Sequence, residues 1–143
     1  MNLNYLYREI IMDHYQNPRN KGLLNNKNYQ LVSLYNPSCG DEVTIQFLLE
    51  GKTIKDIRQE GKGCSICCAS ASLMSETLKG KQTEKALEII ESFANFLMGE
   101  KDENINREML AFEGVGKFPA RIRCAMLAWK ALEKGLKEGV NNG

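Results

Sequence analysis

The chain has 143 residues, of which 43% are hydrophobic and 26% are charged, the composition of an ordinary globular protein. Its 19 basic and 18 acidic residues give a net charge of +1, so no overall electrostatic attraction to nucleic acid or to a membrane surface is expected. We therefore expect one domain, spanning residues 1–143, with a hydrophobic core of its own.

The first half of the chain predicts one helix followed by a small sheet. Apolar residues recur at spacings of three and four over residues 3–16, the period of an amphipathic helix, and Pro18 ends it. Residues 29–35, 43–49 and 53–60 predict strands, with Gly51 in a tight turn between the last two. The imperfect alternation of residues 53–60 indicates a bulge.

The second half of the chain predicts helices. A helical pattern begins at Cys64 and ends near Gly80. Thr83 is predicted to cap the next helix, and Pro119 opens the last one, whose apolar stripe includes Trp129. Because the strands cluster early and the helices late, we expect an α+β fold with a small antiparallel sheet.

The five cysteines are best interpreted through the compartment in which the chain works. Residues 1–9 lack the apolar centre of a secretory signal, and the sequence has no apolar run of 18 residues. We therefore expect a cytoplasmic protein. In a reducing compartment, an odd number of cysteines indicates metal-binding or redox thiols rather than a disulfide framework.

Three cysteines lie far apart in the sequence, each in a turn or near a predicted helix start: Cys39, Cys64 and Cys124. Cys39 and Asp41 are two residues apart in one turn, so both side chains can face one ion. Cys64 and Cys124 lie near helix N-termini, where the helix dipole stabilises a thiolate. Three thiolates and one carboxylate form a plausible tetrahedral zinc site, and the harder carboxylate favours a site that exchanges a ligand over a purely structural one.

The other candidate ligands leave alternatives open. For Cys67 a structural role is favoured, and two functional alternatives stay open: a redox partner of Cys64 in a CxxC pair, or a fourth ligand in place of Asp41. Cys68 is interpreted as part of a small-residue helix face that allows close packing. His14, the only histidine, lies on the apolar stripe of the first helix, so we interpret it as a satisfied or interface residue rather than a ligand.

A zinc ion with three thiolates and one carboxylate carries a net charge of about −2. Compensating cations are close in sequence, since Arg121 and Arg123 flank Cys124 and Lys62 precedes Cys64. We therefore expect Arg123 to contact the groups that hold the metal.

Five motifs, taken together, resemble those of the SufU branch of the IscU-like family of iron–sulfur cluster assembly proteins. They are Asp13 to Asn20, Asn36 to Asp41, Gly61 to Ile66, Ala69 to Ser72, and Phe118 to Ala125. Arg123 stands where the scaffold branch of that family has a histidine, and the segment between Cys64 and Cys124 is longer than in that branch. The scaffold branch's Leu-Pro-Pro-Val-Lys motif is missing. The pair Cys67-Cys68 departs from the family pattern.

The resemblance implies a three-stranded antiparallel sheet packed against about five or six helices, with metal ligands at Cys39, Asp41, Cys64 and Cys124. It also implies a zinc-dependent sulfurtransferase that takes sulfur from a pyridoxal-phosphate-dependent cysteine desulfurase of the SufS type, for iron–sulfur cluster assembly with downstream Suf scaffold proteins. Our hypothesis is that Cys39 accepts the sulfur when a partner side chain replaces it on the metal, and that Arg123 stabilises the freed thiolate or persulfide. The alternatives are a scaffold that assembles a [2Fe–2S] cluster from iron, and a zinc-stabilised adaptor that only docks partners.

Overall fold

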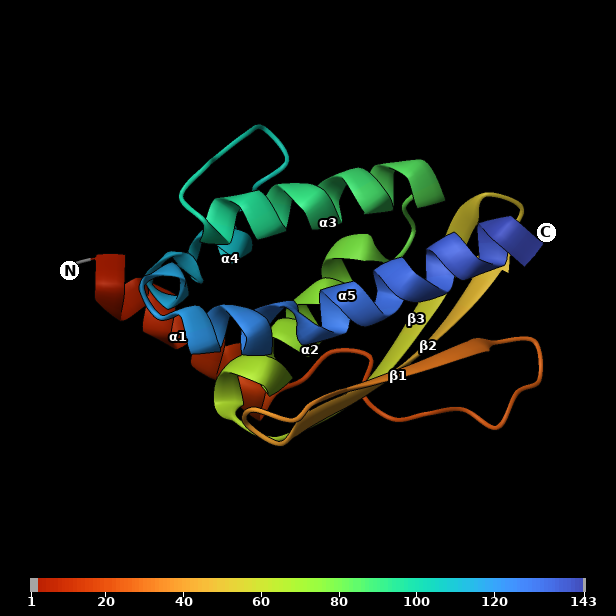
Figure 1. Ribbon diagram of the computed structural model, residues 1–143, viewed down its shortest axis with the longest axis horizontal. Helices are drawn as coiled ribbons and strands as arrows, with labels where there is room; N and C mark the ends of the chain where they lie inside the picture. Colours follow the sequence, from red (N-terminus) through yellow and green to blue (C-terminus); the bar gives the residue numbers. More distant parts are fainter. Residues whose placement is uncertain (1–2, 143) are drawn as a thin grey trace.

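The computed structural model describes residues 3–142, and a three-stranded sheet with helices on one side forms its body (Figure 1). The elements are α1 (Leu3–Gln16), β1 (Gln30–Asn36), β2 (Asp41–Glu50), β3 (Thr53–Lys62), α2 (Ser65–Leu78), α3 (Thr83–Leu97), α4 (Arg107–Leu110), the 3₁₀ helix η1 (Glu113–Lys117) and α5 (Pro119–Asn142). The predicted α+β class is confirmed. Among these described helices, none is long and apolar enough to cross a membrane.

The sheet has the order β1-β2-β3, and both strand pairs are antiparallel. Its register shifts by one residue within the second hairpin, where Leu48 pairs with Asp56 but Leu49 pairs with Ile54. Lys55 is the extra residue on β3, so the bulge predicted for residues 53–60 is confirmed.

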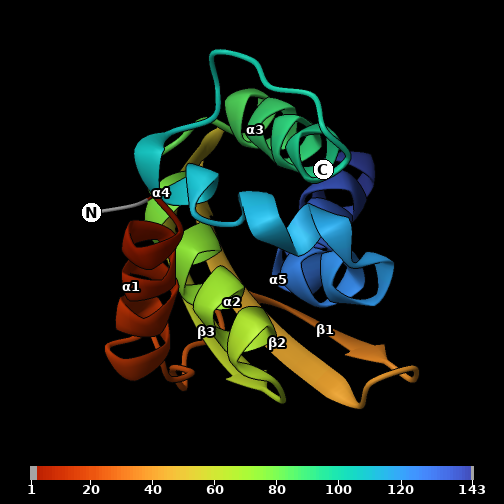
Figure 2. The same cartoon turned by 90° about the vertical axis from the view of Figure 1, so that its left-hand side faces the viewer.

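The helices pack in two layers on one face of the sheet (Figures 1 and 2). Helices α2 and α5 lie against the strands, α1 lies alongside α2, and α3 packs on the outer side of α5. Alternate residues of β2, namely Val43, Ile45 and Phe47, are fully buried beneath them. Helix α5 approaches so closely that a Cβ at Gly135 would lie 2.5 Å from the Phe47 ring, so only glycine fits there.

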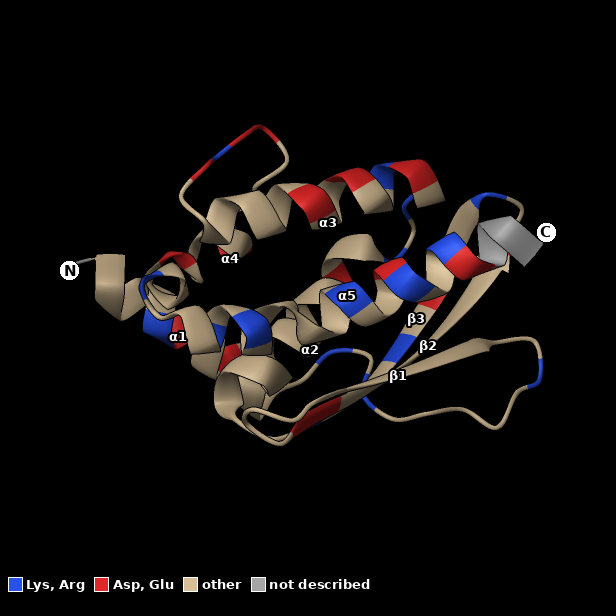
Figure 3. Cartoon of the chain, viewed as in Figure 1, with Lys and Arg blue, Asp and Glu red and all other residues tan. Residues whose placement is uncertain are grey.

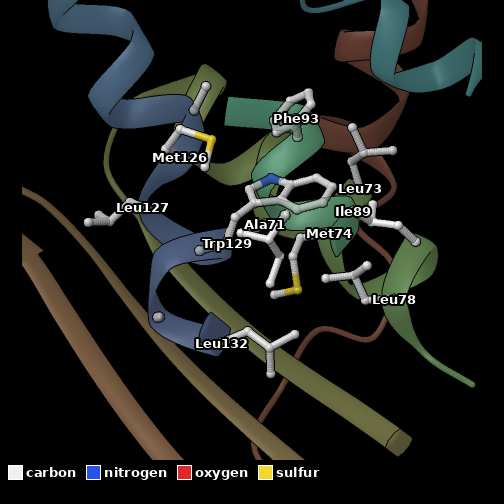
Figure 4. Close-up of a cluster of buried hydrophobic side chains, with 14 of the residues drawn as sticks. Ala71, Leu73, Met74, Leu78, Ile89, Phe93, Met126, Leu127, Trp129 and Leu132 are labelled. Atoms are coloured by element: carbon white, nitrogen blue, oxygen red, sulfur yellow. The ribbon is translucent and has the colours of Figure 1, made fainter. Parts of the chain in front are cut away.

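Trp129 occupies the centre of the core (Figure 4). Its indole stacks on the Phe93 ring with centroids 4.4 Å apart, which joins α5 to α3. Its Nε1–H donates to Ser70 Oγ (2.9 Å), and the Ser70 hydroxyl donates to the carbonyl of Ala125 (2.5 Å). These two bonds fix α5 relative to α2, and the fixed residue of α5 directly follows Cys124.

The start of α3 differs from the prediction. Thr83 is the first helical residue rather than the cap, because its backbone N–H donates to the carbonyl of Lys52 (2.8 Å). The N-cap residue is Gln82, whose side chain forms no capping hydrogen bond. Pairing with the β2–β3 turn therefore sets this helix start, and a side-chain cap does not.

Candidate metal centre

Cys39 and Asp41 lie at the turn between β1 and β2, which Asn36 organises. The side-chain oxygen of Asn36 accepts a hydrogen bond from the N–H of Ser38 (3.1 Å). Its backbone carbonyl accepts from the N–H groups of Cys39 (3.3 Å) and Gly40 (2.8 Å). The turn leaves the Cys39 side chain exposed and directs the Asp41 carboxylate inward, where the residue is 1% exposed.

Cys64 is the N-cap residue of α2, and both its backbone and its thiol contact the Asp41 carboxylate. Its N–H donates to Asp41 Oδ1 (2.9 Å), and its Sγ lies 3.3 Å from Asp41 Oδ2. The same sulfur accepts the N–H of Cys67 (3.4 Å), so the thiol takes the place of the usual Ser or Asp cap.

Cys124 lies in the second turn of α5, which Pro119 begins as the sequence predicts. The residue is almost fully buried, and its Sγ is 3.5 Å from the Sγ of Cys39. Three separate segments, the β1–β2 turn, the start of α2 and the start of α5, therefore bring their side chains to one point.

Three of the four predicted donors lie close enough together to share one metal ion, and the fourth, Cys64, lies beside one of them. Ligand atoms of Cys39, Asp41 and Cys124 all lie within 4.8 Å of one another, and Cys64 joins the group through its 3.3 Å contact with Asp41. A tetrahedral zinc ion with Zn–S bonds of about 2.3 Å places two sulfur ligands about 3.8 Å apart, and an oxygen ligand slightly closer. The spacing and the soft, thiol-rich chemistry both suit zinc.

Proton positions in the thiol cluster, which we define as Cys39, Asp41, Cys64 and Cys124, follow from its burial. Burial acts to raise the pKa of Asp41, but hydrogen bonds from Cys124, from the N–H and thiol of Cys64 and from Cys39 outweigh it and lower the pKa below its ordinary value. Burial raises the pKa of the Cys124 thiol, as do its contacts with Asp41 and Cys39. Metal binding by Cys124 must therefore release the proton of its thiol.

The two remaining thiols, those of Cys67 and Cys68, lie outside the thiol cluster. Cys67 is fully buried, and burial raises the pKa of its thiol. Cys68 packs against Gly61, where a Cβ would lie 3.7 Å from the Cys68 sulfur, so the predicted packing role is confirmed. Asp41, rather than Cys67, therefore lies with Cys39 and Cys124 in one group of possible metal ligands.

Among the described residues, the predicted cations form no hydrogen bond or ion pair with the thiol cluster. Figure 3 shows basic residues along α5. Arg121 lies over the Phe118 ring at 5.1 Å, while Arg123 is exposed and lines a groove of about 550 Å³ with Met98 and Ile122. Within residues 3–142, no hydrogen bond or ion pair joins Arg123 to the thiol cluster. The role of Arg123 stays a prediction.

Two further residues support the site and were not identified from the sequence. Gly63 has φ +133°, and a Cβ there would lie 2.0 Å from Asp41 Oδ1, so only glycine lets the carboxylate occupy its place. The sequence did contain a signal for this role, because Gly63 directly precedes Cys64 in the Gly61-Lys62-Gly63-Cys64 motif. Ser70, by contrast, gave no signal, because its partners lie 55 and 59 residues away in the sequence.

Comparison with known proteins gives consistent matches. The family model "NifU-like N terminal domain" matches residues 6–140. The zinc-dependent sulfurtransferase SufU of Bacillus subtilis is 49% identical over 98% of this chain and 97% of its own length. The iron–sulfur cluster assembly scaffold protein IscU of Streptococcus pyogenes is 37% identical over 97% of this chain and 87% of its own. A crystal structure of a putative iron–sulfur cluster assembly scaffold protein for the SUF system, from Fervidobacterium islandicum, superposes with a TM-score of 0.80 at 37% identity, covering 94% of this chain and 99% of that one.

Proposed function

Since the chain belongs to the NifU-like N-terminal domain family, we propose that it is a zinc-dependent sulfur acceptor in iron–sulfur cluster biogenesis. Its sulfur source is the persulfide of a pyridoxal-phosphate-dependent cysteine desulfurase of the SufS type. The observation that carries the proposal is an exposed thiol, Cys39, placed beside a buried carboxylate and two further thiols. The similarity to SufU over nearly the whole chain supports it.

Cys39, Asp41, Cys64 and Cys124 would hold the zinc ion, which when bound keeps its thiol ligands deprotonated at neutral pH. Asp41 contributes a carboxylate that is already ionised, because its hydrogen bonds lower its pKa. Cys64 is held by its bond to Asp41 and by its capping contact with α2. Cys124 is held by the buried start of α5.

Cys39 is the sulfur acceptor because its thiol is exposed and takes part in no helix cap. Cys64 is also exposed, but its sulfur caps α2 and contacts Asp41, whereas Cys39 lies on a turn. The Cys39 thiolate attacks the terminal sulfur of the donor's cysteine persulfide. A new S–S bond forms on Cys39, the donor's S–S bond breaks, and the donor cysteine leaves as a thiolate, so no external oxidant or reductant is needed.

Arg123 is proposed to assist this exchange by stabilising the thiolate or persulfide of Cys39. The support is its exposed position directly before Cys124 and the lack of a competing carboxylate partner among the described residues. The extra negative charge on a docked persulfide would draw the long guanidinium side chain toward it. The five free thiols support a reducing, cytoplasmic location.

Assembly of a [2Fe–2S] cluster on the same thiols is the second candidate, favoured by the 37% identity to the S. pyogenes scaffold protein IscU. Three thiols with a carboxylate can also ligate iron. Arg123 argues against it, because the resemblance places a histidine at this position in scaffold proteins.

The deciding experiment measures turnover of a cysteine desulfurase under mild reductant with excess zinc-loaded protein. We expect strong stimulation by the wild type and none by Cys39→Ala, while Cys68→Ala, which removes another partly exposed thiol, stimulates like the wild type. Mass spectrometry should find the transferred sulfur on Cys39. Equal stimulation by wild type and Cys39→Ala would sink the proposal, and an iron-dependent colour that transfers to an apo-protein would favour the scaffold.

A further inference from the structure

We propose that His14, Glu76 and Glu108 form a second metal site, for a divalent first-row transition-metal ion, separate from the thiol cluster. One ligand atom from each of these residues lies within 4.8 Å of the other two. The residues come from α1, α2 and α4, which meet at one end of the molecule (Figure 2). The site does not depend on the proposed sulfur transfer.

The spacing of the nearest pair is that of two ligands on one ion. His14 Nε2 lies 3.0 Å from Glu108 Oε1. Two ligands at about 2.1 Å from a metal ion are about 3.0 to 3.4 Å apart, depending on the geometry. Without an ion, a proton on Nε2 bridges this pair, and the metal ion takes the place of that proton.

The imidazole of His14 is held in place from its other side. The residue is fully buried, and its Nδ1 lies 2.8 Å from Ser72 Oγ. The hydroxyl can donate to Nδ1 in the ion-free protein and accept from it when Nε2 binds metal. Ser72 Oγ also accepts the backbone N–H of Arg19 (2.8 Å), which fixes the hydroxyl itself. Such a partner on the second ring nitrogen is typical of histidines that bind metal.

The charges around His14 favour a dication. The carboxylates of Asp13 and Glu76 form ion pairs with Arg19, while that of Glu108 contacts His14. Arg19 contacts Oε2 of Glu76 at 3.3 Å and leaves the other oxygen of that carboxylate available. An ion between the three ligands would balance the excess negative charge.

Access and ligand type set the class of ion. The side chains of Glu76 and Glu108 are 43% and 37% exposed, so an ion reaches the buried nitrogen from solvent. One imidazole and two carboxylates suit Zn²⁺, Fe²⁺, Co²⁺ or Mn²⁺ and, having no sulfur, give no advantage to soft ions. The bound ion would tie α1, α2 and α4 together.

The test titrates Co²⁺ into the full-length protein after its thiol cluster has been filled with one equivalent of zinc. We expect one further equivalent to bind, with weak d–d absorption and no sulfur-to-cobalt charge-transfer band. Because the chain has a single histidine, an ¹⁵N-histidine NMR spectrum reports on His14 alone, and its ring signals should undergo a paramagnetic shift. No further equivalent, or unshifted ring signals, would overturn the proposal.

Substitutions of the two exposed ligands, Glu76 and Glu108, test the site without changing the buried His14. Glu76→Gln and Glu108→Gln should each weaken binding of the second equivalent by about tenfold or more, since even outer-shell changes cost that much. Glu91→Gln, at an exposed glutamate of α3, is the matched control and should bind like the wild type. Zinc binding by the thiol cluster should be unchanged in all three, which shows that they fold. Unchanged Co²⁺ affinity in both ligand variants would refute the site.

Discussion

The thiol cluster and the group around His14 place potential ligands in different ways. In the thiol cluster, the side chains project from a turn and from two helix starts, and their nearest polar neighbours are largely one another. Around His14, both ring nitrogens already have partners on other helices. The first arrangement is complete only with an ion, whereas the second is satisfied without one. We therefore expect backbone conformation to control metal affinity at the thiol cluster. At the group around His14, we expect side-chain identity to control it.

Gly63→Ala should have the largest effect on the thiol cluster. The new Cβ would meet Asp41 Oδ1 at 2.0 Å, at a φ of +133° that other residues rarely adopt. Displacement of the carboxylate, together with strain in the backbone directly before Cys64, should lower zinc affinity by about 100-fold or more, given that outer-shell changes alone cost 10- to 100-fold. Competition with a chromophoric chelator measures this affinity.

A matched control separates the clash from the backbone strain. Gly99 has a similar φ of +105°, but a Cβ there would meet no atom within 4 Å. Gly99→Ala should therefore bind zinc like the wild type. Equal affinities for Gly63→Ala and Gly99→Ala would show that the backbone does not control the thiol cluster.

Asp41→Ala should have the next largest effect, a loss of zinc affinity of about 10- to 100-fold. It removes one donor and leaves the three thiols, which then bind zinc with solvent completing the shell. Glu42→Gln, at the exposed neighbouring acid, is the control. If Asp41→Ala bound zinc as tightly as the wild type, Cys67 would become the better candidate for the fourth ligand, despite its burial.

The four residues of the thiol cluster were predictable from the sequence as one zinc site, whereas the carboxylates beside His14 were not. The turn and the helix start that carry Cys39, Asp41 and Cys124 are marked by Pro37, Gly40 and Pro119. Proline and glycine signals of this kind depend on short-range steric effects, which a sequence shows directly. Residue type and local context grouped the four side chains, and the family resemblance indicated the same four.

Contacts between residues far apart in the sequence determine the features that the sequence patterns did not predict. Thr83 has the residue type of a cap, but the β2–β3 turn takes its N–H. Cys67 lies three residues after Cys64, yet packing of α2 buries it in the core. His14 was predicted to be a satisfied or interface residue, and both ring nitrogens do have partners. The partner on α4 lies 94 residues away, so the sequence pattern did not identify it as a carboxylate.

Ser70→Ala should have the smallest effect on metal binding, a loss of only a few-fold, although it costs about 1–3 kcal/mol in the free energy of unfolding. It leaves the Trp129 Nε1–H and the Ala125 carbonyl without their partner, so α5 can shift slightly against α2. That shift would move Cys124 relative to Cys64, and denaturant unfolding with chelator competition measures both consequences.

Ser75→Ala separates stability from positioning. Ser75 is also fully buried in α2, but its hydroxyl bonds to the carbonyls of Ser72 and Arg19 and to the Asn20 amide, and it forms no hydrogen bond with the described residues of α5. It should therefore destabilise the fold by a similar amount and leave zinc affinity unchanged. If both serine variants lowered zinc affinity equally, general loosening of α2 would explain the loss, and the bridge from Ser70 to α5 would have no special part in placing Cys124.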